Sequence, residues 1–303
     1  MDLAIRPLAE ADLPAADRIY RLAFGTFLGL ADPLVFSAGR DLIGPRWRQD
    51  PQCVLGAFLD GELAGSNVIS TWGSFGFFGP LTIRPDLWDR GIASRLLEPT
   101  IELFTRRGVR QMGLYTFAGS IKHVRLYQKF GFWPQQLTLI LSTAVERPTL
   151  APDWTRFTQS PDLTACAELT NSIFGGLNVE REILTVERQR LGETVLVWEG
   201  SRLAGLAVCH CGRGSEAGPD ACYVKFGAAR FVEAFDRLLD ACLTLAAERG
   251  LARLVAGVNA ARHQAYRRLL ERGFRTDIQG VAMQRPKAAG FNRPGVFVLD
   301  DWR

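Results

Sequence analysis

The hydrophobic pattern of the first half of the chain alternates between short apolar runs and segments in which apolar residues recur every three or four positions. The short runs are typical of buried strands, and the longer spacing is typical of one face of a helix. An Asp60-Gly61 pair between two apolar runs indicates a tight hairpin turn. In chain order, the pattern predicts a strand at 3–7, a helix at 10–23, strands at 54–59, 63–70 and 72–83, a helix from 93 to about 107, a strand at 113–117, a helix at 121–130 and a strand at 137–142.

The second half of the chain repeats parts of the first at an offset near 140 residues. Three matches in the same register predict two copies of one fold rather than chance similarity. We therefore expect an α/β protein with two tandem domains, each a central mixed sheet flanked by helices. The matching segments are 59–65 with 199–205, 106–108 with 248–250, and 128–132 with 270–274. The predicted divisions are an N-terminal domain at 1–143, a linker at 144–154, a degenerate C-terminal domain at 155–286 and a tail at 287–303.

The segment from Leu81 to Leu97 (LTIRPDLWDRGIASRLL) is the most informative stretch. Its strand ends at Arg84-Pro85, because proline cannot donate to a sheet and restricts the residue before it. A turn containing Gly91 then leads into a helix. Such a turn offers unpaired backbone N–H groups and the positive end of a helix dipole to an anion.

This turn resembles the pyrophosphate loop of the GNAT superfamily of N-acyltransferases, whose pattern is Gln/Arg-x-x-Gly-x-Gly/Ala. Gly91 and Ala93 match the pattern, whereas Trp88 stands at the Gln/Arg position. A second resemblance follows in SIKHVRLYQKFGF at 120–132, which is similar to the GNAT helix pattern Asn-x-x-Ala-x-x-x-Tyr-x-x-x-Gly-Phe. Here Tyr127, Gly131 and Phe132 match, Ser120 replaces Asn, and His123 replaces Ala.

The resemblance implies a function and a binding site in the first copy. It implies an acyltransferase that uses acetyl-CoA, or another acyl-CoA, as co-substrate, without a metal. The strand before the loop is expected to pair with the pantetheine arm through its backbone, and the loop is expected to hold the pyrophosphate. The implied cofactor-binding residues are Leu81, Thr82, Ile83, Trp88, Asp89, Arg90, Gly91, Ile92, Ala93, Ser94 and Ser120.

Tyr127 is the expected general acid. The ordinary pKa of a thiol is about 8.5 and that of a phenol about 10, so a tyrosine within reach can stabilise or protonate a departing CoA thiolate. The alternative is that Tyr127 is a core residue with its hydroxyl at the rim. No acidic residue occurs in 72–83 to act as the base, so His123 or a water chain is expected to take the ammonium proton; His123 otherwise only fills a small-residue position.

The second copy lacks these features. Leu269 stands where Tyr127 stands in the first copy, and the segment 225–230 has no Gly-x-Gly/Ala loop. We expect this copy to be structural and to supply a wall of the acceptor site. Aromatic residues near the expected acceptor position suggest an acceptor with an apolar part, although most of them are expected in the core: Phe24, Phe27, Trp47, Trp72, Phe75, Phe77 and Phe78.

Composition excludes some other classes. The net charge is only +4, and the lysine and arginine residues are scattered among acidic ones. We therefore expect no continuous basic surface that would bind nucleic acid. No apolar run approaches the roughly 20 residues of a membrane span, and no signal-peptide pattern is present, so we expect a cytoplasmic protein without membrane partners. The six cysteines show no disulfide framework, and the Cys209-His210-Cys211 run lies in an apparent strand, where neighbours point to opposite faces rather than toward one metal.

The sequence thus predicts an N-acetyltransferase acting on the primary amine of a small molecule by direct attack in a ternary complex, as a monomer or homodimer. Two alternatives stay open. One is a catalytically silent sensor or scaffold that binds acyl-CoA, favoured by Trp88 and by the missing acid in 72–83. The other is a protein or peptide N-acetyltransferase, which needs an open groove.

Overall fold

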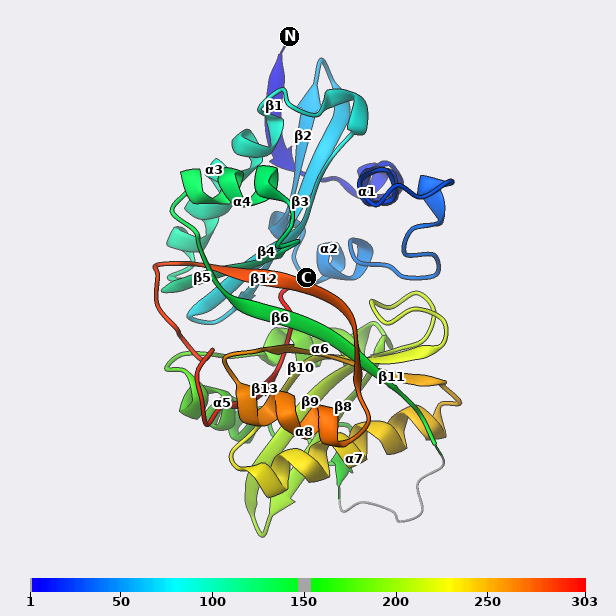
Figure 1. The fold of residues 1–303 in the computed structure, drawn as a ribbon, viewed down its shortest axis with the longest axis vertical. Coiled ribbons are helices and arrows are strands. Elements are labelled where there is room, and N and C mark those ends of the chain that lie inside the picture. The colour runs from blue at the N-terminus through cyan, green and yellow to red at the C-terminus, as the bar shows by residue number, and fades with distance from the viewer. Residues whose placement is uncertain (1, 147–153) are drawn as a thin grey trace.

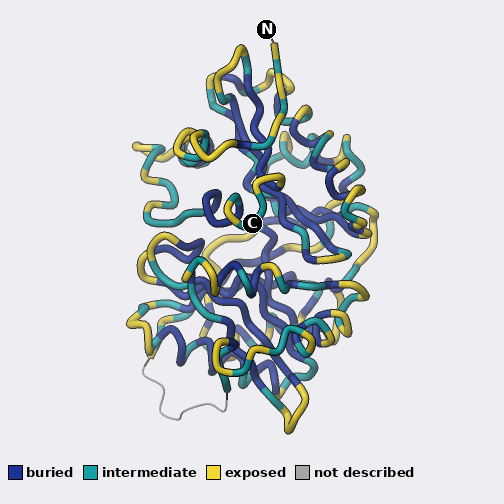
Figure 2. The backbone as a smooth tube through the Cα atoms, turned by 180° about the vertical axis from the view of Figure 1, so that it is seen from behind, coloured by how far each residue is buried: buried dark blue, intermediate teal, exposed yellow. Residues whose placement is uncertain are grey.

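The computed structural model describes residues 2–146 and 154–303. It contains one continuous mixed sheet of 13 strands, with helices packed against it in both halves of the molecule (Figure 1). The buried backbone runs through the centre of both halves, while the exposed segments are mainly turns and helix surfaces (Figure 2). This arrangement confirms the mixed α/β fold predicted from the sequence.

The first half follows the predicted order closely. The Asp60-Gly61 hairpin is present, and both residues have the positive φ angles that such a turn requires. The predicted strand at 72–83 starts later, because Trp72 ends the strand before it. The elements are β1 (Leu3–Pro7), a 3-10 turn (Glu10–Asp12), α1 (Leu13–Phe27), α2 (Gly44–Gln49), β2 (Val54–Leu59), β3 (Glu62–Trp72), β4 (Phe75–Ile83), α3 (Ile92–Arg106), β5 (Gln111–Thr116), α4 (Ile121–Lys129) and β6 (Trp133–Ala144).

The second half has the same sequence of elements after its own two helices. Cys209, His210 and Cys211 lie in one strand, as expected. Most of the predicted linker, residues 147–153, lies outside the described part of the chain. The elements are β7 (Thr155–Arg156), α5 (Leu163–Ile173), α6 (Glu180–Arg188), β8 (Gly192–Glu199), β9 (Arg202–Cys211), β10 (Ala221–Ala229), α7 (Val232–Glu248), β11 (Arg253–Asn259), α8 (His263–Glu271), β12 (Arg275–Arg285) and β13 (Phe297–Leu299).

Strands β6 and β12 join the two halves. Along the sheet the order is β4-β5-β12-β6-β11-β10, so the last strand of each half lies beside the other half. Strand β12 pairs with β5, and β6 pairs with β11, both antiparallel. The two strands also pair with each other, as in the centre of Figure 1. Each half therefore completes its sheet with a strand from the other.

Alternating residues of the strands in the first half face two separate cores. In β2, Val54 and Phe58 pack with Tyr20 of α1, whereas Leu55 and Ala57 pack with Leu96 of α3. This is the period-two alternation expected of a strand buried on both faces. Helices α1 and α3 thus cover opposite faces of the sheet.

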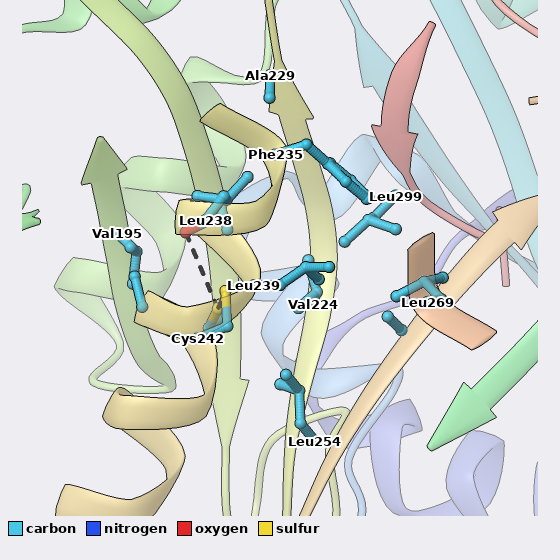
Figure 3. Close-up of a cluster of buried hydrophobic side chains, with 14 of the residues drawn as sticks. Val195, Val224, Ala229, Phe235, Leu238, Leu239, Cys242, Leu254, Leu269 and Leu299 are labelled. Carbon is cyan, nitrogen blue, oxygen red and sulfur yellow. Dashed lines mark hydrogen bonds between the residues drawn. The ribbon is translucent and has the colours of Figure 1, made fainter. Parts of the chain in front are cut away.

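The tail at 287–303 contacts both halves of the molecule. Its strand β13 pairs antiparallel with the end of β10, with Leu299 opposite Gly227 and Phe297 opposite Ala229. Leu299 lies in the same buried cluster as Phe235 of α7 and Leu269 of α8 (Figure 3). Beyond β13 the chain continues to residue 303, which lies near the centre of the molecule between the two halves (Figure 1).

A mutation in β6 tests whether this strand stabilises the second half. Leu141 is fully buried in the core of the second half, so Leu141→Ala is expected to lower the free energy of unfolding by about 2–5 kcal/mol, because it leaves a cavity. Urea unfolding measures this change. The matched control is Leu137→Ala in the same strand, where the side chain is 42% exposed and the expected change is within about 0.5 kcal/mol. Equal effects of the two substitutions would contradict the assignment.

Candidate functional site

A cavity of about 1250 Å³ lies between the two halves of the molecule. Its walls come from α1 and the segment after it, the end of β4 with the loop that follows, α4, and parts of the second half and the tail. All the residues predicted from the sequence as catalytic or cofactor-binding line this one cavity: Leu81, Thr82, Ile83, Trp88, Asp89, Arg90, Gly91, Ile92, Ala93, Ser94, Ser120, His123 and Tyr127.

The end of β4 has a free backbone edge in this cavity. Strands β4 and β5 are parallel and pair only from Phe75–Gln111 to Phe78–Leu114. Beyond Phe78 the opposite edge of β4 remains paired with β3, with Leu81 opposite Asn67 and Ile83 opposite Gly65. Among the described strands, none pairs with β4 on its β5 side from Gly79 to Ile83. In this stretch the Gly79 and Ile83 carbonyl oxygens accept hydrogen bonds from the side chains of Arg46 and Trp88. The other backbone groups on this edge are available to an extended ligand.

The loop between β4 and α3 ends in a helix N-terminus that faces the cavity. Gly91 caps α3 in the left-handed conformation, with φ of 78°, which glycine adopts without steric cost. The first backbone N–H groups of α3 have no partner within the helix and point along its axis out of the N-terminus. The indole N–H of Trp88 donates to the Ile83 carbonyl oxygen at 2.8 Å. Trp88 therefore fixes the loop to the end of β4, which explains how the loop keeps its shape without the Gln or Arg of the pattern.

Basic side chains flank this loop. Arg90 lies in the loop, and Lys122, Arg125 and Lys129 lie on α4, all on the cavity wall. The three residues of α4 are spaced by three and four positions and thus share one helix face. Lys122 also contacts the Asp89 carboxylate at 2.6 Å. The sequence prediction missed the α4 residues as part of the site, although their helical spacing was a readable signal.

Tyr127 and His123 lie one helical turn apart on α4. Tyr127 is 7% exposed and packs against Phe78 of β4, with ring centroids 5.8 Å apart. Burial raises the pKa of Tyr127 above its ordinary value, so the phenol is neutral at pH 7. The His123 ring lies 5.2 Å from Phe27. Burial, and then the Lys122 charge, lower the pKa of His123 below 6.5, so the imidazole is also neutral at pH 7.

The aromatic residues highlighted in the sequence divide between the core and the cavity. Trp72, Phe75 and Phe77 belong to a buried cluster shared with the second half. Trp47 packs with α1, and its indole donates to the Leu8 carbonyl oxygen. The remaining three, Phe24, Phe27 and Phe78, line the cavity, as do Tyr20 and Phe36.

A buried ionic cluster borders the cavity at the junction of the halves. The Arg46 guanidinium donates to both carboxylate oxygens of Glu216 at 2.8 Å, and Lys225 donates to the same carboxylate at 2.8 Å. Although burial opposes ionisation, Arg46 and Lys225 hold the pKa of Glu216 well below its usual range. Arg46 also donates to the Gly79 carbonyl oxygen at 2.7 Å and to the main-chain oxygen of Arg303 at 2.5 Å. Glu216 and Arg303 lie 170 and 257 positions from Arg46, so no local pattern reveals these contacts.

The corresponding place in the second half is filled by the chain itself. Strands β10 and β11 are parallel and pair only from Ala221 to Val224 of β10. Beyond that point β13 occupies the edge of β10 on this side, and the Asp300 N–H bonds to Gly257 at the end of β11. Only Arg230 and Phe231 separate β10 from α7, so the long loop of the first half is missing. A smaller cavity of about 390 Å³ remains there.

Leu269 occupies the position corresponding to Tyr127 and is fully buried. The described residues include no group of three His, Cys, Asp or Glu arranged to hold a metal ion. None of the helices in residues 2–146 and 154–303 combines the length and the hydrophobicity that a bilayer crossing needs.

Comparison with known proteins agrees with this geometry. Residues 17–132 match the family model for the Acetyltransferase (GNAT) family. A structure from Pyrococcus horikoshii named as an acetyltransferase is 16% identical, with a TM-score of 0.72 over 99% of this chain and 95% of that one. A GCN5-related N-acetyltransferase from Sphaerobacter thermophilus is 18% identical, with a TM-score of 0.60 over 93% of this chain and 95% of that one.

A GCN5-related N-acetyltransferase from Anabaena variabilis is 13% identical, with a TM-score of 0.53 over 94% of this chain and 72% of that one. No curated protein matches the sequence. The structural likenesses are to folds that extend over nearly the whole chain, and the family model covers the half that contains the loop and Tyr127. Residues 17–132 therefore resemble the GNAT family of acetyltransferases in sequence, and the solved structures share the fold of nearly the whole chain.

Proposed function

We propose that the protein is an acetyl-CoA-dependent N-acetyltransferase whose active site lies in the first half and acts on the primary amine of a small molecule. The observation that carries this proposal is the combination of a free β4 edge, a Gly91-capped helix N-terminus and the Tyr127 hydroxyl in one cavity. The corresponding edge in the second half is occupied by β13, so a single active site per chain is expected.

The residues present fit acetyl-CoA, which supplies the acyl group as a thioester when it is bound. Leu81 to Ile83 offer backbone hydrogen-bonding groups to a pantetheine amide chain. The first turn of α3 offers N–H groups and the positive end of its dipole to the pyrophosphate. Arg90, Lys122, Arg125 and Lys129 add the positive charge that a ligand with several phosphates needs.

Tyr127 is proposed to protonate or hydrogen-bond the departing sulfur. Its raised pKa keeps the proton on the phenol until negative charge develops next to it. Among the described residues, no side chain or backbone group forms a hydrogen bond with this hydroxyl, so it is available for a ligand. The packing of the Tyr127 ring against Phe78 holds this ring beside the end of the paired part of β4.

His123 is the stronger candidate for the base. Its lowered pKa leaves one imidazole nitrogen unprotonated at pH 7, so His123 can accept a proton directly or through a water. Glu216 is the other candidate, but both of its oxygens accept hydrogen bonds from Arg46, and Lys225 binds one of them. Its depressed pKa further reduces its basicity.

A small acceptor is favoured over a protein or peptide. The acceptor side of the cavity is bordered by Pro219 and Asp220 of the second half and by Trp302 and Arg303 of the tail. These residues narrow the space that an open peptide groove would need. The aromatic side chains of α1 and the segment after it form the facing wall.

Replacing the phenol tests the proposed acid. Tyr127→Phe is expected to reduce thiol release from acetyl-CoA by at least about tenfold, because a positioned acid contributes roughly 10²–10⁴ to the rate. The assay uses a panel of amines, amino acids, polyamines and aminoglycosides. Tyr266→Phe on α8 is the matched control and is expected to leave the rate unchanged. Unchanged turnover in Tyr127→Phe would remove this residue from the mechanism, and acetyl-CoA binding without turnover on any acceptor would favour the silent sensor.

Two glycines at opposite ends of α3 test the pyrophosphate loop. Gly91 and Gly108 both have positive φ, and an added Cβ meets no atom within 4 Å at either position. Both substitutions to alanine are therefore expected to cost a similar 1–2 kcal/mol of stability, roughly the penalty for a left-handed residue. Only Gly91→Ala is expected to weaken acetyl-CoA binding, measured by isothermal titration calorimetry. Equal binding by both variants would show that the α3 N-terminus does not hold the cofactor.

The number of cofactor sites tests the role of β13. Titration calorimetry is expected to give one acetyl-CoA per chain, since β13 occupies the edge of β10 that corresponds to the free edge of β4. A stoichiometry of two, which falls to one in Gly91→Ala, would show that the tail leaves the second half during binding.

A further inference from the structure

We infer that the acceptor is an amine that also carries an anionic group, a carboxylate or a phosphonate-like group, bound by Arg40 at the end of the cavity away from the pyrophosphate loop. This inference rests on the function proposed above and specifies its acceptor. It comes from three observations: the absence of an ion-pair partner for Arg40 among the described residues, the charged and aromatic residues around Arg40, and its position relative to β4.

Arg40 is a half-buried cation whose charge is uncompensated. It lines the cavity, and among the described residues no carboxylate forms an ion pair with its guanidinium. Its backbone is fixed, because the main-chain oxygen of Arg40 accepts a hydrogen bond from Arg21 at 3.0 Å, and Arg21 is paired with Asp17. The side chain is therefore held at the cavity by a rigid segment while its donors remain available.

The nearby charges reinforce this excess. Burial is the main factor that lowers the pKa of Arg40, followed by the positive charge of Arg303; Arg253 acts in the same direction. Arg303 is paired with Asp301 at 3.2 Å and Arg253 with Asp220 at 3.3 Å. Arg40 has no such partner, so concentrating these three guanidinium groups costs free energy that an anionic ligand would recover. A planar guanidinium is also well suited to bind a carboxylate or phosphonate through two hydrogen bonds.

The position of this cluster fits an acceptor rather than the cofactor phosphates. Arg46 bonds both the Gly79 carbonyl oxygen and the main-chain oxygen of Arg303. Gly79 is where β4 separates from β5, which is the end of the cavity expected to hold the thioester. The phosphate-binding side chains proposed above lie instead on α4 and in the loop before α3. An anion at Arg40 would therefore belong to the second substrate.

The other residues of the cavity wall indicate the chemistry of the rest of the acceptor. Phe24 and Phe36 stack with centroids 5.3 Å apart, and Tyr20 packs edge-on against both. The Tyr115 hydroxyl and the Ser37 hydroxyl are buried without a hydrogen-bond partner, and both residues line the cavity. An apolar or aromatic body with a polar end matches this lining. Amino acids with apolar side chains, and their phosphonate analogues, have this chemistry.

A matched substrate set tests the inference. The acceptors are L-phenylalanine, its phosphonate analogue, L-phenylalaninamide and phenethylamine, with kcat/KM measured in wild type, Arg40→Gln and Arg18→Gln. Arg18 is an exposed residue of α1 and serves as the control. The wild type is expected to prefer at least one anionic acceptor over both neutral ones by about tenfold or more, the usual effect of a charge-assisted hydrogen bond. The amine of L-phenylalaninamide is less basic than that of L-phenylalanine, so more of it is in the reactive unprotonated form. This difference favours the neutral acceptor and therefore works against the expected preference.

Arg40→Gln is expected to remove most of this preference while leaving the KM for acetyl-CoA unchanged, and Arg18→Gln is expected to retain it. A preference for the carboxylate or for the phosphonate identifies the anion. The inference is overturned if the neutral acceptors react as well as the anionic ones, or if Arg40→Gln keeps the preference.

Binding separates this result from failure of the proposed function. N-acetyl-L-phenylalanine and its amide are titrated into the protein saturated with CoA. Tighter binding of the acid in wild type, lost in Arg40→Gln, supports the anion site even if no acceptor is turned over. Absence of thiol release with every amine, despite acetyl-CoA binding, would refute the proposed enzymatic activity but not the anion site. Equal binding of acid and amide would refute the anion site whether or not the protein is an enzyme.

Discussion

The buried ion pair between Arg46 and Glu216 fixes the geometry on which the cavity depends. Arg46 belongs to the first half and Glu216 to the second, and the same guanidinium also binds the backbone of Gly79 and of Arg303. One side chain thus joins α2, the end of the paired part of β4, the second half and the tail. Loss of Glu216 would leave the buried charges of Arg46 and Lys225 without their carboxylate, and an unpaired buried charge typically costs several kcal/mol. The shape of this part of the cavity is therefore coupled to the contact between the halves.

In each half two parallel strands separate part of the way along their length, and the strand edge beyond that point is treated differently in the two halves. In the first half the strands separate beyond Phe78 and the edge of β4 stays free. In the second half they separate beyond Val224 and β13 closes the edge with backbone hydrogen bonds. Closing an exposed edge in this way removes unsatisfied backbone groups and a site for unwanted strand pairing. The tail that closes this edge continues to Trp302 and Arg303, which line the cavity.

The local features were readable from the sequence, while the long-range ones were not. The strand before Arg84, the Gly91 turn and the helix bearing Tyr127 each depend on neighbouring residues, and the pattern predicted them. The repeat also indicated that Leu269 replaces Tyr127. The positions of β6 and β12 depend on pairing between residues more than 100 positions apart, for which hydrophobic periodicity carries no information. Arg40 and Glu216 appear in the sequence as ordinary charged residues, and only folding brings them to the cavity.

The exchange of β6 and β12 has a consequence for synthesis of the chain. When residues 1–146 have left the ribosome, the place between β5 and β6 is still vacant, because residues 275–285 fill it. At about 5–20 residues per second, the nascent first half spends seconds with two unpaired strand edges facing solvent. Such edges favour aggregation, and pairings between distant segments form slowly. The completed molecule is thus protected from edge pairing by a topology that leaves these edges open until residues 275–285 have been synthesised.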